Sequence, residues 1–307
     1  TPFQYSVPNL RVTFGRAKRN VGAGADMRGP GRVPGLYATE SAMNEVADQL
    51  KMDPVKLRIL NEPKIDESKG IPFSSRHLVE CFEVGAEKFG WSRRTPEVAS
   101  MNRDGLTLGW GMAGCSWIAA RFPAAASLHL RDDGTVRVAS ATQDIGTGMY
   151  TVLAQLASQK TGAPLEKIEV ALGDTALPEG PVSGGSMATA SVVPAVLGAA
   201  DSAIAALLSV AVTTPGSPFE NRKPEDLTFQ NGRVFVKQEG ANKGVTFSDL
   251  LRRANLRLVS GSGNSPMTFG NPKPITRLVA RMLTVPRGTD RSGNGPGNGW
   301  RPPRPKT

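Results

Sequence analysis

Apolar residues recur at helical spacing in several segments of the chain, and these segments predict helices. Residues 35–50 place Met43, Val46, Ala47 and Leu50 on one face. Further helices are predicted over residues 53–62, 75–89, 149–161, 191–212 and 247–255. The second of these begins with an Asp-Pro pair, which suits an N-cap followed by the first helical residue.

Alternating apolar and polar residues predict two β-hairpins. The first joins residues 128–131 and 136–139 through an Asp-Gly turn, and the second joins 227–229 and 234–236 through an Asn-Gly turn. Residues 168–172 predict one more strand. This mixture predicts an α+β fold of mixed β-sheets with packed helices, and the polar stretch 92–105 predicts a boundary between two parts of it.

Composition supports a folded body and excludes several classes of protein. Of the 307 residues, 39% are hydrophobic and 21% are charged, which excludes wholesale disorder. Two cysteines and two histidines exclude a disulfide scaffold and a four-cysteine zinc or iron–sulfur site, so no side-chain metal ligands are predicted. The longest apolar stretch, residues 194–212, carries Asp201 and many small residues, so no membrane span is predicted.

The net charge of +10 is concentrated in the last part of the chain. Residues 271–307 contain eight Lys or Arg residues and one acidic residue, and 12 of their 37 residues are Gly or Pro. We therefore expect a basic tail that is disordered or translated out of frame. A nucleic-acid-binding protein that uses this tail is an alternative, but the charges of the body are nearly balanced, so nucleic acid is not the expected partner.

Three Gly-rich loops lead directly into predicted helices, at residues 27–31, 143–148 and 183–191. Glycine lets a ligand approach the backbone, and the N–H groups at a helix N-terminus favour anions, above all phosphates. None of the loops matches a P-loop or a dinucleotide-binding fingerprint in a βαβ setting. A single loop of this kind is usually only a turn with a helix cap, whereas three of them could hold one polyphosphate ligand.

At these loops the chain resembles the molybdenum hydroxylases, in particular the molybdopterin-binding large subunit of xanthine and aldehyde dehydrogenases. The resemblance rests on Arg-Gly-Pro-Gly at 28–31, the pattern A-x-E-S-A-M-x-E-x-A that follows, and M-D-P-x-x-L-R-x-x-N at 52–61. It continues through 143–148, 172–175 and 183–192 in the same order, and it covers about residues 5–270. The bacterial aldehyde-oxidising branch with separate subunits is the most similar.

The resemblance implies molybdopterin with molybdenum as the cofactor, in bacteria usually as the cytosine dinucleotide. It implies that Arg28, Gly29 and Gly31 lie near the metal end, that Gly146, Thr147 and Gly148 lie along the pterin, and that Ala190 and Ser191 contact it from the third loop. Many relatives have Gln where this chain has Thr147, and Phe where it has Pro30. A glutamine contact and an aromatic substrate wall are therefore not expected at these positions.

The resemblance also implies the reaction, the partners and the extent of the domain. It implies hydroxylation of an aldehyde or N-heterocycle with oxygen from water. Iron–sulfur and FAD subunits would accept the electrons. The enzyme would lie in the cytoplasm or, alternatively, in the periplasm. Residues 1–98 would be the end of one molybdopterin-binding half and 106–270 the start of the other. The catalytic glutamate of the family has no counterpart after Ser191, so we expect an internal fragment that is inactive alone.

Several single residues invite other interpretations. Cys81 is expected in the core, Cys115 near the substrate funnel that the resemblance implies, and His129 on a polar strand surface. A non-catalytic module that binds a phosphate-containing ligand needs only the Gly-rich loops, and it remains the alternative to the enzyme.

Overall fold

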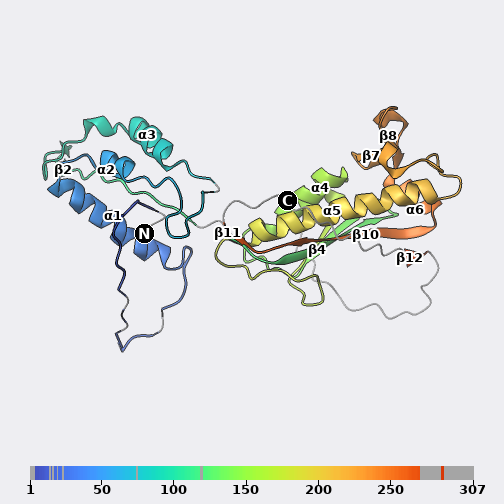
Figure 1. Cartoon of the computed structure of the whole chain (residues 1–307), viewed down its shortest axis with the longest axis horizontal. Helices are drawn as coiled ribbons and strands as arrows, with labels where there is room; N and C mark the ends of the chain where they lie inside the picture. Colours follow the sequence, from blue (N-terminus) through green and yellow to red (C-terminus); the bar gives the residue numbers. More distant parts are fainter. Residues whose placement is uncertain are drawn as a thin grey trace. The chain divides into compact units, whose positions relative to one another are not determined.

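The computed structural model describes residues 4–269, without 14, 16, 19, 23, 74, 118 and 119, together with residues 285 and 286. The tail after Phe269, apart from Val285–Pro286, lies outside the described residues, and so does the prediction made for it. The chain divides into two compact units, shown in Figure 1. Unit 1 comprises residues 1–122, 184–190 and 267–275, and unit 2 comprises residues 123–183, 191–266 and 276–307.

Unit 1 is mainly helical. Its helices are α1 (Arg32–Gln49), α2 (Pro54–Leu60) and α3 (Leu78–Phe89), followed by the 3-10 turn η1 (Trp91–Arg93). Short antiparallel pairs join β1 (Asn102–Arg103) to β2 (Leu106–Thr107), and β3 (Ala120–Arg121) to β11 (Thr268–Phe269). The helices enclose a small core built on Val55, Phe82 and Trp91.

The start of α2 shows how the sequence sets an element of this unit. The carboxylate of Asp53 accepts hydrogen bonds from the N–H groups of Val55 at 2.8 Å and Lys56 at 3.1 Å, and Pro54 occupies the first helical position. The other oxygen of Asp53 accepts from the indole of Trp91 at 2.8 Å. The predicted N-cap therefore also fixes a core tryptophan.

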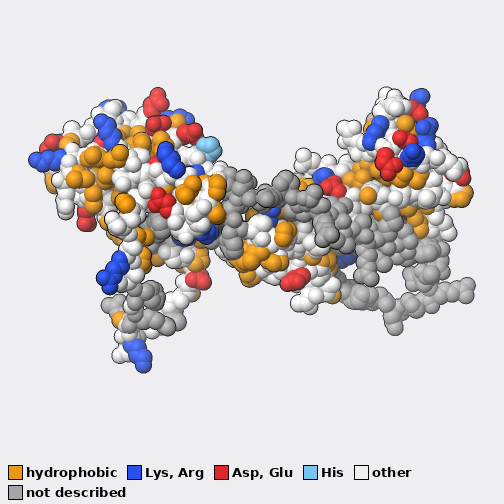
Figure 2. Space-filling model, viewed as in Figure 1, with side chains coloured by type: hydrophobic (Ala, Val, Ile, Leu, Met, Phe, Trp, Pro, Cys, Tyr) orange, Lys and Arg blue, Asp and Glu red, His pale blue; other side chains and the backbone are white. Residues whose placement is uncertain are grey.

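Helix α1 buries a different set of residues from the one predicted. Only Glu40 and Ala47 are buried, whereas Val46 is 44% and Leu50 58% exposed. The predicted apolar face is thus wrong in part, because α1 packs on α2 through a buried polar residue. Figure 2 shows hydrophobic side chains on the visible surface of unit 1, among charged ones.

Unit 2 is built on a five-stranded mixed sheet in the order β12-β10-β4-β5-β6. Its strands are β4 (Ala124–Arg131), β5 (Val136–Ser140), β6 (Ile168–Leu172), β10 (Leu256–Ser265) and β12 (Val285–Pro286). β5 and β6 are parallel and the other neighbours are antiparallel. Helix α4 (Met149–Thr161) connects β5 to β6, as the helical connection between parallel strands requires.

A second, three-stranded sheet and two further helices complete unit 2. The sheet contains β7 (Leu227–Gln230), β8 (Arg233–Val236) and β9 (Val245–Thr246). The helices are α5 (Ala188–Thr213), which belongs to unit 2 from Ser191 onward, and α6 (Phe247–Arg253). Three 3-10 turns connect elements of unit 2: η2 (Leu165–Lys167) before β6, η3 (Pro224–Asp226) before β7, and η4 (Ala241–Lys243) before β9. The α+β class is confirmed, and every predicted helix is present with ends within three residues of those predicted.

Helix α5 is long and apolar enough to cross a membrane by length and composition, the one such helix among the described residues. However, 56% of its apolar window is buried inside the fold. α4 and α5 lie on the same face of the main sheet (Figure 1). In β10, Gly261 and Gly263 face α5 so closely that an added Cβ on Gly263 would lie 2.1 Å from the carbonyl oxygen of Ala195. α5 therefore packs as a core helix closely against two glycines of β10.

Candidate cofactor-binding site

The first predicted loop lies in unit 1 and ends at α1. Gly29 and Gly31 have left-handed φ angles of 82° and 67°, and the N–H groups of Arg32 and Val33 bond to the carbonyl oxygen of Gly29 at 3.0 and 3.2 Å. Gly31 is the N-cap of α1 and makes no side-chain cap. Arg28 is exposed, and a Cβ added to Gly31 would meet no atom within 4 Å. The backbone of this loop is therefore open on one side.

The second predicted loop lies in unit 2, between β5 and α4. Oδ1 of Asp144 accepts hydrogen bonds from the N–H groups of Gly146 and Thr147, both at 2.8 Å, and of Gly148 at 3.3 Å. Its Oδ2 accepts from the N–H of Tyr150 at 3.3 Å. The sequence predicts these N–H groups to be available to an anion, and this is wrong, because the chain's own carboxylate already accepts from them.

The ionisation of Asp144 follows from this arrangement. Partial burial acts to raise the pKa of its carboxyl group, but the backbone donors of Tyr150, Gly146, Thr147 and Gly148 outweigh that effect and hold the pKa below its usual value. The loop therefore carries a negative charge at neutral pH.

The third predicted loop begins α5. Gly185 and Ser186 have positive φ angles of 59° and 58°, and the N–H of Met187 bonds to the carbonyl oxygen of Gly184 at 3.3 Å. Ala190 is exposed, whereas Ser191 is fully buried in α5. A role for Ser191 at the cofactor stays a prediction.

Hydrogen bonds join the second loop to the start of the third. Oε1 of Gln143 accepts from the N–H of Ser183 at 3.0 Å, and the hydroxyl of Ser183 donates to the carbonyl oxygen of Gln143. The hydroxyl of Thr142 donates to the carbonyl oxygen of Pro181 at 2.9 Å. Two of the predicted loops are thus contiguous at their bases. The convergence of all three on one cleft stays a prediction, because the first loop and residues 184–190 belong to unit 1.

The segment of Cys115 lies against the third loop within unit 1. The indole Nε1 of Trp117 donates to the carbonyl oxygen of Gly185 at 3.1 Å. Cys115, two residues earlier, is exposed. Cys81 is exposed as well, and its prediction as a core residue is wrong. α3 buries Phe82 instead, and the neighbouring position on a helix points about 100° away.

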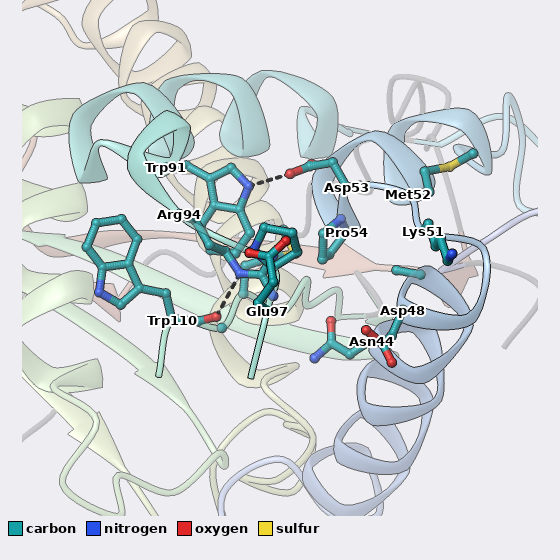
Figure 3. Close-up of a pocket in the computed structure, with 14 residues that line it drawn as sticks. Asn44, Asp48, Lys51, Met52, Asp53, Pro54, Trp91, Arg94, Glu97 and Trp110 are labelled. Carbon is teal, nitrogen blue, oxygen red and sulfur yellow. Dashed lines mark hydrogen bonds between the residues drawn. The ribbon is translucent and has the colours of Figure 1, made fainter. Parts of the chain in front are cut away.

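Unit 1 also contains a cavity of about 650 Å³ that the sequence does not reveal. It is lined by the end of α1, the start of α2, η1 and residues 110–112. Figure 3 shows Asn44 and Asp48 on α1 on one side and Trp91, Arg94 and Trp110 on the other. The Nε of Arg94 donates to the carbonyl oxygen of Trp110 at 3.3 Å, so this cationic side chain is already hydrogen-bonded to a residue that lines the cavity.

Other polar groups have structural partners. His129 lies on the polar face of β4, as expected, but it is half-buried rather than at the surface. Glu220 accepts from the N–H of Gly216 at 2.8 Å, and Glu239 pairs with Arg222 at 3.4 Å. Among the described residues, no group of three or more His, Cys, Asp or Glu side chains is arranged to hold a metal ion.

Sequence reasoning overlooked a buried network that holds unit 1 together. Glu40 pairs with Arg58 at 2.8 Å and accepts from the hydroxyl of Tyr5, also at 2.8 Å. Glu40 is the first glutamate of the motif at 38–47, and Arg58 is the arginine of the motif at 52–61. Those motifs were therefore the signal, although they do not reveal that the two residues meet.

Comparison with protein families decides the identity of this arrangement. The profile of a molybdopterin cofactor-binding domain matches residues 84–276, well over half of the chain, and that of a second such domain matches residues 2–62. The chain belongs to the molybdopterin cofactor-binding domain family. The resemblance stated from the loops and motifs is confirmed.

The chain is similar to molybdenum-binding subunits of oxidoreductases. The chain is 38% identical over 182 residues to the molybdenum-binding subunit PaoC of an Escherichia coli K12 aldehyde oxidoreductase, a match that covers 59% of this chain and 25% of PaoC. It is 31% identical over 159 residues to XdhA, a putative xanthine dehydrogenase molybdenum-binding subunit from the same organism, covering 49% and 21%. The chain thus spans about a quarter of the length of PaoC.

Solved structures of two oxidoreductases share the fold. CO dehydrogenase from Oligotropha carboxidovorans superposes with a TM-score of 0.57 at 19% identity, covering 78% of this chain and 33% of the other. Quinoline 2-oxidoreductase from Pseudomonas putida 86 gives 0.53 at 18% identity, covering 76% and 33%.

Proposed function

We propose that the chain forms part of the cofactor-binding region of a molybdenum-dependent oxidoreductase subunit of the aldehyde or xanthine dehydrogenase type. The observation that carries this proposal is the 38% identity with PaoC over 182 residues. The match of residues 84–276 to the molybdopterin cofactor-binding profile supports it. The proposed reaction is hydroxylation at carbon with oxygen derived from water.

The loops fit a ligand that approaches the backbone. A Cβ added at Gly31, Gly146, Gly148 or Gly184 would meet no atom within 4 Å, so these positions are glycines beside open space. Such glycines allow the close approach of a large ligand. When bound, the molybdenum cofactor would supply two-electron oxidation chemistry.

The residues proposed to hold this cofactor are those of the three loops. They are Arg28, Gly29, Gly31, Gly146, Thr147, Gly148, Ala190 and Ser191. We further propose that the cofactor is the cytosine dinucleotide form of molybdopterin. The exposed Arg28 provides the one cationic side chain of this set.

The wider setting follows from the same proposal. Iron–sulfur and FAD subunits would take the electrons, and the substrate would be a small aldehyde or an N-heterocycle. The parent enzyme would lie in the cytoplasm, without membrane or nucleic-acid partners. Residues 1–98 and 106–270 would contribute to two halves of the molybdopterin-binding domain.

The test measures cofactor content. The full chain is purified from a host that makes the molybdenum cofactor, and molybdenum and the fluorescence of the oxidised pterin are measured per polypeptide. Gly146→Val should reduce both several-fold. Gly240→Val is the matched control, because both glycines have positive φ (94° and 80°) and neither has an atom within 4 Å of an added Cβ.

The control is expected to keep the cofactor content of the wild type. Equal losses in the two variants would refute the assignment of the second loop. Absence of both molybdenum and pterin from the wild-type chain would refute cofactor binding by this chain.

A further inference from the structure

Asp144 occupies the place that an anionic ligand would take at the N-terminus of α4. We propose that Asp144 is a positioning residue that closes this N-terminus to phosphate and reserves the second loop for an uncharged part of the ligand. The identity of that ligand rests on the proposed function, whereas the exclusion of phosphate rests on the geometry of this loop alone.

Asp144 already occupies the N–H groups at the start of α4. A helix N-terminus offers N–H groups without intrahelical partners, and these attract anions. At α4 the carboxylate of Asp144 accepts from Gly146, Thr147, Gly148 and Tyr150 at 2.8 to 3.3 Å. The N-cap itself, Gly148, has no side chain that could accept a hydrogen bond. Asp144 therefore supplies the cap from four residues upstream.

The negative charge of Asp144 also repels a phosphate. A phosphate that approached the same N–H groups would have to lie beside an ionised carboxylate, and like charges at this distance repel. The same carboxylate offsets the positive end of the α4 dipole. The attraction that makes other helix N-termini phosphate sites is thus already used within the chain.

The surface that remains explains what the loop can accept. Gly146 and Thr147 are exposed, and the space beside Gly146 and Gly148 is open. A ligand there meets glycine backbone and the Thr147 hydroxyl. A neutral ring system can lie against such a surface, since it needs no anion-binding donors.

Asp144 also fixes the shape of this surface. Gly146 and Gly148 hold left-handed φ angles of 94° and 84°, and the bonds to Asp144 hold the residues between them in one turn. The adjacent Gln143 bonds to Ser183, so the turn is anchored to the base of the third loop. The loop is therefore preformed before any ligand binds.

The experiment uses inorganic pyrophosphate as the probe and the full chain labelled with ¹⁵N. In the wild type, the amide signals of Gly146, Thr147 and Gly148 should not shift on titration. Asp144→Ala should make them shift saturably and should speed their hydrogen exchange by about tenfold, since each loses a bond to a charged acceptor. Saturable shifts in the wild type, or none in Asp144→Ala, would overturn the proposal.

A second variant guards against loss of folding. Asp144→Asn keeps one acceptor oxygen, so Gly146 and Thr147 should keep slow exchange while Tyr150 exchanges faster. Faster exchange at all of these amides, or at none, would contradict the assigned bonding. Asp133→Ala is the matched control, because Asp133 caps Thr135 at 2.9 Å at the other end of β5. It should leave the second loop unchanged.

A cofactor readout connects this result to the proposed function. Asp144→Ala should lower the molybdenum content per polypeptide, and Asp133→Ala should not; equal contents in wild type and Asp144→Ala would show that Asp144 does not position the loop for the cofactor. The pyrophosphate titration needs no cofactor. Its failure would therefore refute the exclusion of phosphate and leave the proposed function standing.

Discussion

The carboxylate of Glu40 and the guanidinium of Arg58 form an ion pair inside unit 1, with 2.8 Å between Oε2 and Nε and side-chain exposures of 5% and 0%. Tyr5 donates to the other carboxylate oxygen, and the N–H of Gly114 donates to Oε2 at 2.8 Å. Arg58 also donates to the carbonyl oxygen of Pro54 at 3.0 Å. Because hydrogen bonds satisfy both charges, one pair ties together four segments of unit 1.

Removal of one partner should strongly destabilise this unit. Arg58→Met leaves an uncompensated buried carboxylate, and we expect a loss of about 3–5 kcal/mol in the free energy of unfolding. Three of the four tryptophans, Trp91, Trp110 and Trp117, belong to unit 1, so tryptophan fluorescence during urea unfolding reports it.

The control for this prediction is an exposed pair in the same unit. Arg103 and Asp104 lie 3.9 Å apart with exposures of 77% and 89%, and Arg103→Met should cost at most about 1 kcal/mol. Similar losses in Arg58→Met and Arg103→Met would show that the buried pair does not stabilise unit 1.

This pair illustrates what sequence reasoning could and could not supply. The helical period located α1 and α2, and the motifs singled out Glu40 and Arg58. The pattern of polar and apolar residues nevertheless assigns charged residues to the surface. Only the packing of α1 on α2 brings Glu40 and Arg58 together. A local pattern cannot express this contact, because the two residues are 18 positions apart in the sequence.

Strand β10 was missed for a different reason. Residues 256–265 read Leu-Arg-Leu-Val-Ser-Gly-Ser-Gly-Asn-Ser, and Gly, Ser and Asn have weak strand preference. The strand is nevertheless paired with β4 over eight residues. Its glycines are required by the close approach of α5, which is a tertiary property that no local pattern expresses.

For the candidate site, the sequence predicted the positions of the loops but not the contacts within them. The Gly-rich pattern located all three loops, because glycine and the start of a helix are local signals. The role of Asp144 was not predicted, since it depends on the turn that brings its carboxylate back to its own loop. The exposure of Cys81 was likewise set by which face of α3 meets Val55 and Trp91.

The contact between α5 and β10 predicts a large effect of one methyl group. In Gly263→Ala the new Cβ would lie 2.1 Å from the carbonyl oxygen of Ala195 and 2.4 Å from the nitrogen of Ala199. Helix and strand must separate, and we expect a loss of about 1–3 kcal/mol or more in the free energy of unfolding. Urea unfolding followed by circular dichroism measures it.

A substitution of the same kind serves as the control. Gly85 lies within α3, and a Cβ there would meet no atom within 4 Å. Gly85→Ala should therefore raise the free energy of unfolding by about 0.5–1 kcal/mol. A Gly263→Ala variant as stable as the wild type would mean that α5 does not pack on the glycines of β10.

The exposure of both cysteines predicts their reactivity. Cys81 and Cys115 are exposed and not linked by a disulfide. The native chain should therefore take up two maleimide groups without denaturant, as counted by mass spectrometry. Cys81→Ser should reduce the uptake to one. Suppose the native wild type takes up only one group, and two in urea, while native Cys81→Ser still takes up one. Cys81 would then be buried in the folded chain.

The polar face of the main sheet carries a histidine with an unusual environment. His129 pairs in register with Arg137, and Arg137 pairs with Glu169 on the next strand. The pKa of His129 is lowered from 6.5, first by burial, then by the charges of Arg137 and Arg131, while Glu169 partly opposes them. His129 is therefore neutral in the folded chain at pH 7.

A lowered histidine pKa gives stability a definite pH dependence. Below pH 6.5 the unfolded chain binds a proton at this histidine that the folded chain does not, so the free energy of unfolding should fall as the pH drops from 7 toward 5.5. His129→Asn should remove this part of the decline. Urea unfolding of the wild type and of His129→Asn at pH 7.0 and 5.5 measures the difference. An undiminished decline in His129→Asn would show that His129 is not the group that titrates.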